Sequence, residues 1–150
     1  MMHYLSVHDI VWINSTITGK SLPFDYEKLE AAMAAQYSYG DSTNVPVQSA
    51  NLLSTLVHSP SFAYGNQRTA FIAVTTFLNA NGYALQVDDS QAADLIRDVA
   101  SKQLTPAEGI ASLAAPADIT LRPGVTLRAL VSYIFNEHTE AIKSLAQGDE

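Results

Sequence analysis

Hydrophobic residues near the start of the chain recur at the three- and four-residue spacing of an amphipathic helix. This pattern predicts a first helix over about 7–17, which Gly19 ends. Asp25 can cap a second helix, which carries apolar residues on one face as far as Tyr37. The connection 19–24 contains a glycine and a proline, so it is predicted to be a loop or a short flap.

The middle of the chain contains two helices that are apolar on nearly every face. The turn-rich segment 38–46 ends at Pro46, which suits a first helical position, and the residues to about 58 form the third predicted helix. The fourth spans about 66–80, with Gly82 as a favourable residue after its end. Its β-branched residues would also suit a strand, but its length favours a helix. Because such helices must be surrounded, we expect both at the centre of the domain.

The remaining sequence predicts a short extended piece, three further helices and a frayed tail. The extended piece is 83–87. The helices are one from Asp88 or Ser90 through Val99, one opened by the capping box 105–108 and ending near Leu113, and one over about 126–145. The tail is the acidic segment 147–150. No internal repeat or linker between domains is visible. The sequence therefore predicts a single all-α domain over 1–150, a bundle of six or seven helices with two central apolar helices.

Composition excludes several classes of function. The 150 residues are 47% hydrophobic and 15% charged, which is ample for one folded domain with its own core. The formal net charge of −7, with 8 lysines and arginines, argues against binding nucleic acid or an anionic membrane surface. No signal peptide or membrane-spanning run is visible. The absence of cysteine excludes disulfides and thiolate chemistry and fits the cytoplasm, where we expect this protein.

The segment 59–70, SPSFAYGNQRTA, is the strongest candidate for a functional loop. Gly65 allows a close backbone approach, and the first N–H groups of the helix that follows are free to bind an anion. Arg68, one turn into that helix, can bind a pair of phosphate oxygens. The alternative is an ordinary connection in which Arg68 pairs with a surface carboxylate.

The same segment resembles the motif of the Fic/Doc family, in particular its Doc (death-on-curing) branch. The family motif is H-x-F-x-D/E-G/A-N-G/K-R, followed in the Doc branch by T-A. The resemblance covers about residues 1–100 and is loose in the C-terminal third. The matching residues are Phe62, Gly65, Asn66, Arg68, Thr69 and Ala70. The resemblance implies that Gly65, Asn66, Gln67 and Arg68 bind a nucleotide or anion and that Phe62 anchors the loop.

Two departures from the motif affect the chemistry that the resemblance implies. The family's histidine, the general base for the target hydroxyl, is replaced by Pro60, and its acidic residue, which helps to hold the metal, is replaced by Tyr64. The residue before the arginine is Gln67, and Phe71 stands where AMP-transferring members carry a second arginine. Loss of a general base alone typically costs about 10²–10⁴ in rate. We therefore expect transfer of the family type to be weak or absent.

The loop and its surroundings contain few residues that could fill the missing roles. His58 is the candidate replacement base, although its spacing favours a position at the end of the third helix. We call the expected anion site of Gly65, Asn66, Gln67 and Arg68 the cradle. Tyr64 is expected to cover this cradle or to stack on a ligand. No histidines and carboxylates show the spacing of metal ligands, so we predict no metal bound by the protein alone and no other bound cofactor. ATP with Mg would be the ligand if nucleotide binding is retained.

Two functional hypotheses follow. In the first, the chain is a degenerate relative of toxins that transfer phosphate or AMP from ATP to a protein hydroxyl. The resemblance implies elongation factor Tu as the target. In the second, it is a non-catalytic helical module of the toxin–antitoxin type. Its antitoxin segment would then lie in a groove beside the first helices, lined by Val11, Trp12 and Ile17.

Overall fold

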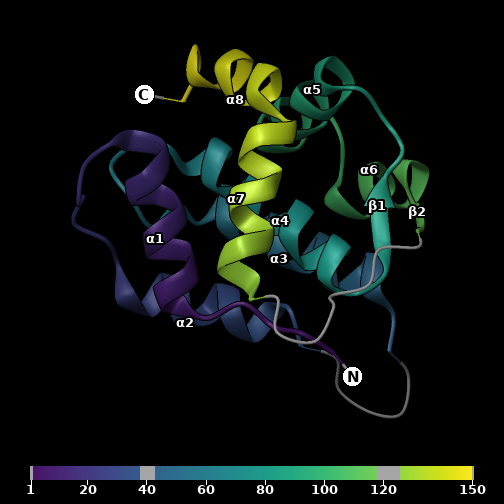
Figure 1. Cartoon of the computed structure of the whole chain (residues 1–150), viewed down its shortest axis with the longest axis horizontal. Helices are drawn as coiled ribbons and strands as arrows, with labels where there is room; N and C mark the ends of the chain where they lie inside the picture. The colour runs from purple at the N-terminus through teal and green to yellow at the C-terminus, as the bar shows by residue number, and fades with distance from the viewer. Residues whose placement is uncertain (1, 38–42, 118–125, 150) are drawn as a thin grey trace.

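The computed structural model describes residues 2–37, 43–117 and 126–149, and within them the chain is an all-α domain of eight helices with one small sheet (Figure 1). The helices are α1 (Val7–Thr18), α2 (Tyr26–Ala35), α3 (Val45–His58), α4 (Asn66–Ala80), α5 (Asp89–Ala100), α6 (Pro106–Leu113), α7 (Leu127–Glu137) and α8 (Thr139–Ala146). The predicted all-α class is confirmed. Part of the predicted turn-rich break, 38–42, lies outside the described residues.

Local cap signals set the starts of several helices. The Ser6 hydroxyl accepts from the Asp9 N–H at 3.2 Å, and the Asp9 carboxylate accepts from the Ser6 N–H at 2.9 Å. This reciprocal capping box begins α1. Asp25 caps α2 as predicted, and Asp88 rather than Ser90 caps α5.

Helix α4 is the central element of the domain. It contacts α1, α3, α5, α7, α8 and β1, and every residue from Thr69 to Ala80 is buried. The apolar character of this segment on all faces is explained by these contacts. Helix α3 packs on α2, α4, α5 and α6 but is not surrounded, because Val47 is 52% exposed and Asn51 is also exposed. The expectation that α3 is covered on nearly every face was therefore wrong.

A two-stranded antiparallel sheet lies beside the C-terminal end of α4. Strand β1 (Tyr83–Leu85) falls within the predicted extended piece 83–87, whereas β2 (Ala114–Pro116) was not predicted. The register pairs Ala84 with Ala115. The segment that forms β2 lacks both alternation and β-branched residues, so its extended form depends on a partner distant in sequence.

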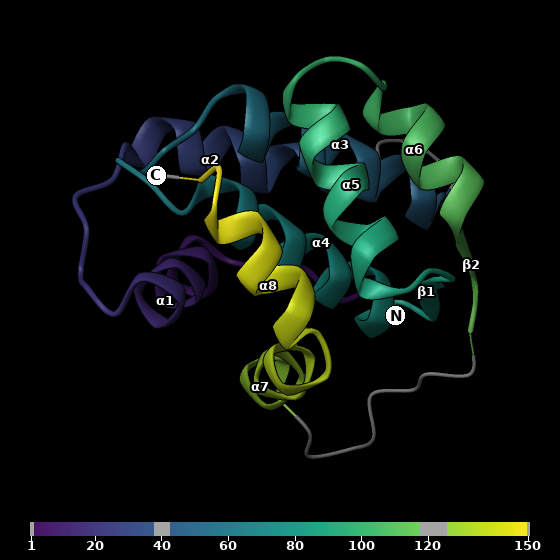
Figure 2. The ribbon, with the colours of Figure 1, turned by 90° about the horizontal axis from the view of Figure 1, so that it is seen from above.

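The predicted last helix is divided in two at His138. The backbone there leaves the helical region (φ −122°, ψ 34°), and α8 runs away from α7 in a new direction (Figure 1). The segment after α8 then turns back to the side of the molecule where α4 begins (Figure 2). The prediction of a frayed tail over 147–150 was wrong for Asp149, which is buried with 7% of its surface exposed.

Candidate functional site

The loop that enters α4 turns on Gly65. This residue precedes the first helical residue and has φ of 79°, a conformation that L residues with a side chain rarely adopt. A Cβ atom at this position would lie 2.9 Å from Thr18 Cγ2 and 3.1 Å from Asn14 Nδ2. Both the backbone angle and the close approach of α1 therefore favour glycine here.

The side chain of Asn66 braces the loop internally. Its Oδ1 accepts from the Phe62 N–H at 3.1 Å, and its Nδ2 donates to the Phe62 carbonyl at 2.8 Å. Phe62 is buried and packs on Phe24, with ring centroids 6.1 Å apart. The chain just before α2 reaches the loop as well, because Phe24 forms an isolated antiparallel bridge with Phe62 and the Asp25 N–H donates to Ser61 O at 2.9 Å. The amide of Asn66 is therefore used within the loop, and the anion-binding role expected of this residue is left to its neighbours.

The hydrogen-bond donors of the cradle are bound by Asp149, which lies in the segment after α8. Its carboxylate accepts from the backbone N–H groups of Gln67 at 2.8 Å and Arg68 at 3.0 Å. It also accepts from Arg68 Nε at 3.0 Å. The Asp149 carbonyl accepts from the Gly65 N–H at 2.9 Å. Three of the four residues expected to bind an anion thus donate to this one residue.

This arrangement combines the two readings of the loop. The N–H groups at the start of a helix and an arginine converge on one negatively charged group, as an anion site requires. The anion is a carboxylate of the same chain. This agrees with the alternative that Arg68 forms an ion pair, but the pair is buried and not on the surface. The Arg68 and Asp149 side chains are only 11% and 4% exposed. We expected Tyr64 to cover the cradle. The hydrogen bonds of the cradle are instead accepted by Asp149.

The candidate base, His58, faces away from the loop. It is the last residue of α3, and its Nε2 lies 2.9 Å from the carbonyl of Val99 in the last turn of α5. Its Nδ1 lies 3.4 Å from the Ser54 hydroxyl. The Lys28 ammonium group lies 3.4 Å from the carbonyl of Pro60, the residue expected to replace the histidine of the motif. Both nitrogens of His58 are thus engaged elsewhere.

The residues around the cradle do not fit a metal clamp of the family type. Tyr64, at the position of the acidic residue, offers a phenol, whereas Mg²⁺ prefers carboxylate, phosphate and water oxygens. The Asp149 carboxylate is already engaged with Gln67 and Arg68. Among the described residues there is no group of three or more His, Asp or Glu that could hold a metal ion.

The predicted groove residues lie on α1, and α7 covers part of them. Val11, Trp12 and Ile17 are half-buried. The guanidinium group of Arg128 lies 4.7 Å from the centre of the Trp12 ring, and its Nε is 3.2 Å from the Asp9 carboxylate. The face of α1 around Trp12 is therefore partly occupied by a residue of the same chain.

Two residues important to the site were not among the predicted ones. Asn14 is buried, and its Nδ2 donates to the Tyr64 carbonyl and to the Thr69 hydroxyl, both at 3.2 Å. A polar residue on the apolar face of the first helix is a signal that points to such a role. Asp149 has no comparable signal, because a single carboxylate near a chain end is common on protein surfaces.

The central buried helix, entered through a loop with the pattern F-x-x-G-N-x-R-T-A, is the arrangement expected of the Fic/Doc class. Comparison of the sequence with known proteins agrees. The chain is 34% identical to Toxin Doc of Mycolicibacterium smegmatis over an alignment of 109 residues, which covers 68% of this chain and 84% of that protein. The chain belongs to the Doc family.

No protein-family model matches the chain, and no solved structure matches it. Within 2–37, 43–117 and 126–149, none of the helices has the length and apolar character that crossing a membrane requires.

Proposed function

We propose that this Doc-family protein binds an anionic group of a phosphate compound at the start of α4, and that it performs the family's group transfer weakly or not at all. The observation that carries the proposal is the convergence of the Gln67 N–H, the Arg68 N–H and Arg68 Nε on one carboxylate. Donors arranged in this way suit two oxygens of a phosphate group equally well.

In this proposal Asp149 and the external anion compete for the same donors. A phosphate cannot reach the N–H groups of Gln67 and Arg68 until the Asp149 carboxylate leaves them. The measured affinity is then the intrinsic affinity reduced by the fraction of molecules in which the cradle is open. Weak binding by the wild-type chain is therefore compatible with a well-formed site.

Calorimetry with inorganic phosphate, and with ATP in the presence of Mg²⁺, tests this proposal. Asp149→Ala should raise the affinity for either ligand by about tenfold or more, because the competing carboxylate is gone. Arg68→Ala in the same background should weaken binding by about 1.5–3 kcal/mol, the range for hydrogen bonds to charged groups. Asp94→Ala is the control, since its carboxylate lies on an exposed face of α5. Absence of binding by Asp149→Ala with an intact fold would remove the proposed site.

Reduced transfer is supported by the positions of three side chains. Pro60 offers no proton acceptor, Tyr64 offers no carboxylate, and His58 contacts the carbonyl of Val99. Incubation with γ-labelled or adenine-labelled ATP and elongation factor Tu, the target that the family resemblance suggests, should leave that protein unlabelled. Labelling that His58→Ala abolishes would contradict this part of the proposal.

The second candidate function is the binding of an antitoxin segment beside α1. Membership of a family with a curated toxin favours it, as does the half-buried apolar row of Val11, Trp12 and Ile17. Trp12 is the single tryptophan of the chain, so its fluorescence reports on this surface. A titrated antitoxin peptide should shift the emission of Trp12, and Ile17→Ser should weaken that response. Phosphate should leave the emission unchanged, which separates the two candidate functions.

A further inference from the structure

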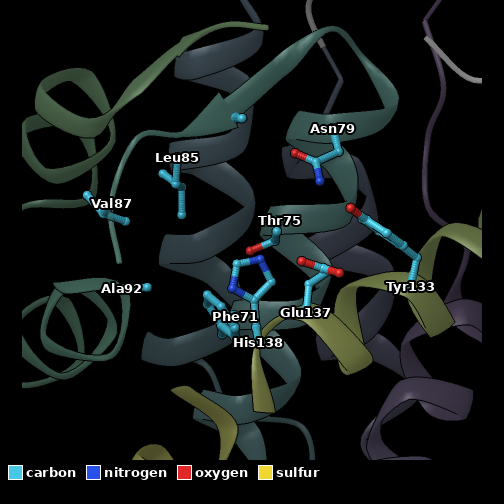
Figure 3. A pocket seen from close by; sticks show the side chains of 10 residues that line it. Phe71, Thr75, Asn79, Leu85, Val87, Ala92, Tyr133, Glu137 and His138 are labelled. Atoms are coloured by element: carbon cyan, nitrogen blue, oxygen red, sulfur yellow. The ribbon is translucent and has the colours of Figure 1, made fainter. Parts of the chain in front are cut away.

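A pocket lined by none of the cradle residues lies along the later turns of α4. It has a volume of about 190 Å³ and is bordered by α4, strand β1 with the residue Val87 after it, α5, α7 and His138 (Figure 3). Phe71, Thr75 and Asn79 face it from successive turns of α4. Three helices, one strand and the residue between α7 and α8 thus contribute to one hollow.

Thr75 has a buried hydroxyl group without a partner at this pocket. The residue is 4% exposed, and its Oγ1 makes no hydrogen bond to any described residue. The adjacent Thr76 shows the usual arrangement, in which the hydroxyl donates to the carbonyl of Ile72 at 2.7 Å. Figure 3 shows the Thr75 hydroxyl turned into the pocket instead. Since buried polar groups nearly always have a partner, a water or a ligand that reaches this hydroxyl from the pocket would satisfy it.

His138 is held in a fixed orientation at the same pocket. Its Nδ1 lies 2.8 Å from the Asp89 carboxylate, and its ring meets Phe71 edge-on with centroids 5.5 Å apart. The bond to Asp89 occupies one ring nitrogen and leaves Nε2 for another partner. Figure 3 shows the ring and the Glu137 carboxylate directed into the same space as the Thr75 hydroxyl.

The character of the walls indicates the class of ligand. Phe71, Leu85 and Val87 supply apolar surface for a flat ring, and Asn79 supplies an amide that both donates and accepts. Glu137 and Tyr133, which are both exposed, lie on the α7 side of the pocket. A carboxylate in this position disfavours anions and attracts cations.

We propose that this pocket binds a small aromatic or heterocyclic amine or amidine. The ring contacts Phe71, Leu85 and Val87, and a polar edge bonds the Thr75 hydroxyl and the Asn79 amide. The positively charged nitrogen is directed towards Glu137. The ligand carries no phosphate, so this site is separate in position and in chemistry from the cradle at Gln67 and Arg68.

Three probes of nearly equal shape and different charge test the proposal by calorimetry or ligand-observed NMR. Wild-type protein should bind benzamidine saturably, benzamide more weakly, and benzoate not at all. Glu137→Gln should weaken benzamidine binding by about fivefold and leave benzamide unchanged, because an exposed ion pair contributes modestly. Glu30→Gln, which removes a charge from the exposed face of α2, is the matched control.

Thr75→Val provides a test that separates a binding role from a structural one. The substitution keeps the shape and removes the unpartnered hydroxyl, so it should raise the thermal midpoint of the free protein while weakening benzamide and benzamidine about five- to tenfold. A purely structural hydroxyl would change stability and leave affinity unaltered. Binding of none of the probes by the wild type, equal binding of benzoate, or affinity unchanged in both variants would overturn the proposal.

Discussion

Two independent features of the structure require glycine at position 65, the backbone angle and the close contact with α1. Its φ of 79° is unfavourable for residues with a side chain, and an added Cβ would lie 2.9 Å from Thr18 Cγ2. Gly19 provides a comparison, because it has φ of 70° but nothing within 4 Å of the added atom. The two glycines therefore separate the cost of the backbone angle from the cost of the contact.

Gly65→Ala should lower the free energy of unfolding by about 2–3 kcal/mol, from backbone strain together with displacement of α1. Gly19→Ala should lower it by about 1 kcal/mol, since only the backbone angle opposes the substitution. Urea unfolding followed by circular dichroism measures both. Equal losses in the two variants would show that the contact with Thr18 does not constrain the loop.

Asp149 is the residue on which the proposed function depends most directly. An ion pair this deeply buried is stabilising only while both partners and their hydrogen bonds are present. The Asp149→Ala variant should therefore gain affinity for phosphate and lose stability at once. A gain in affinity without any loss of stability would indicate that the Asp149 carboxylate rarely occupies the cradle.

At the scale of elements, Asp89 joins three helices. It lies in the first turn of α5, its Oδ1 is 2.8 Å from His138 Nδ1 at the end of α7, and its Oδ2 accepts from the Ala141 N–H in α8 at 3.1 Å. Because α8 leads directly to Asp149, the contact at Asp89 helps to place the carboxylate in the cradle. The break between α7 and α8 thus has a consequence for the candidate site.

Asp89→Ala should lower the free energy of unfolding by about 1–2 kcal/mol, as two hydrogen bonds of a partly exposed carboxylate are lost. Hydrogen exchange should also become faster in α8 and at the Gln67 and Arg68 amides, because the segment after α8 is less firmly held. Asp94→Ala, on the same helix, is the control and should change stability by less than about 0.5 kcal/mol. Unchanged hydrogen exchange at Gln67 and Arg68 would show that the position of α8 does not affect the cradle.

At the scale of the whole molecule, we expect the loop, α4 and the segment after α8 together to control whether transfer can occur. Restoring the family residues through Pro60→His and Tyr64→Asp supplies a proton acceptor and a carboxylate for magnesium. Since Asp149 still occupies the donors of the proposed phosphate site, we expect measurable transfer only when Asp149→Ala is added.

Labelling of a bacterial lysate with γ-labelled or adenine-labelled ATP measures this restoration. The wild-type chain should give no efficient labelling, and each single family substitution should remain inactive because base and metal clamp act on one transition state. The substitution at Pro60 frees a backbone N–H and can extend α3, so the structure of the triple variant is the control. A triple variant that keeps the loop, binds ATP and transfers nothing would show that more than these side chains has been lost.

The sequence by itself determined the features that depend on neighbours within a few positions. The caps at Asp25 and Thr105, the glycine before α4 and the all-round apolar character of α4 follow from short-range spacing, and the structure places these helices where they were expected. The exposed strip of α3 was missed, because apolar and small residues occur on both buried and exposed faces.

Only the tertiary structure decided which groups meet in the two sites. Asp149 reaches Arg68 across 81 positions of the chain, and His138 reaches Asp89 across 49. Such contacts depend on the directions in which separate helices leave their turns, and no local pattern of hydrophobic and polar residues carries that information. The division of the last predicted helix at His138 also depends on a distant segment, because the Asp89 carboxylate that contacts His138 and Ala141 lies on α5. Helix formation is short-range, whereas the closing of the cradle and the shape of the pocket are set by packing between distant segments.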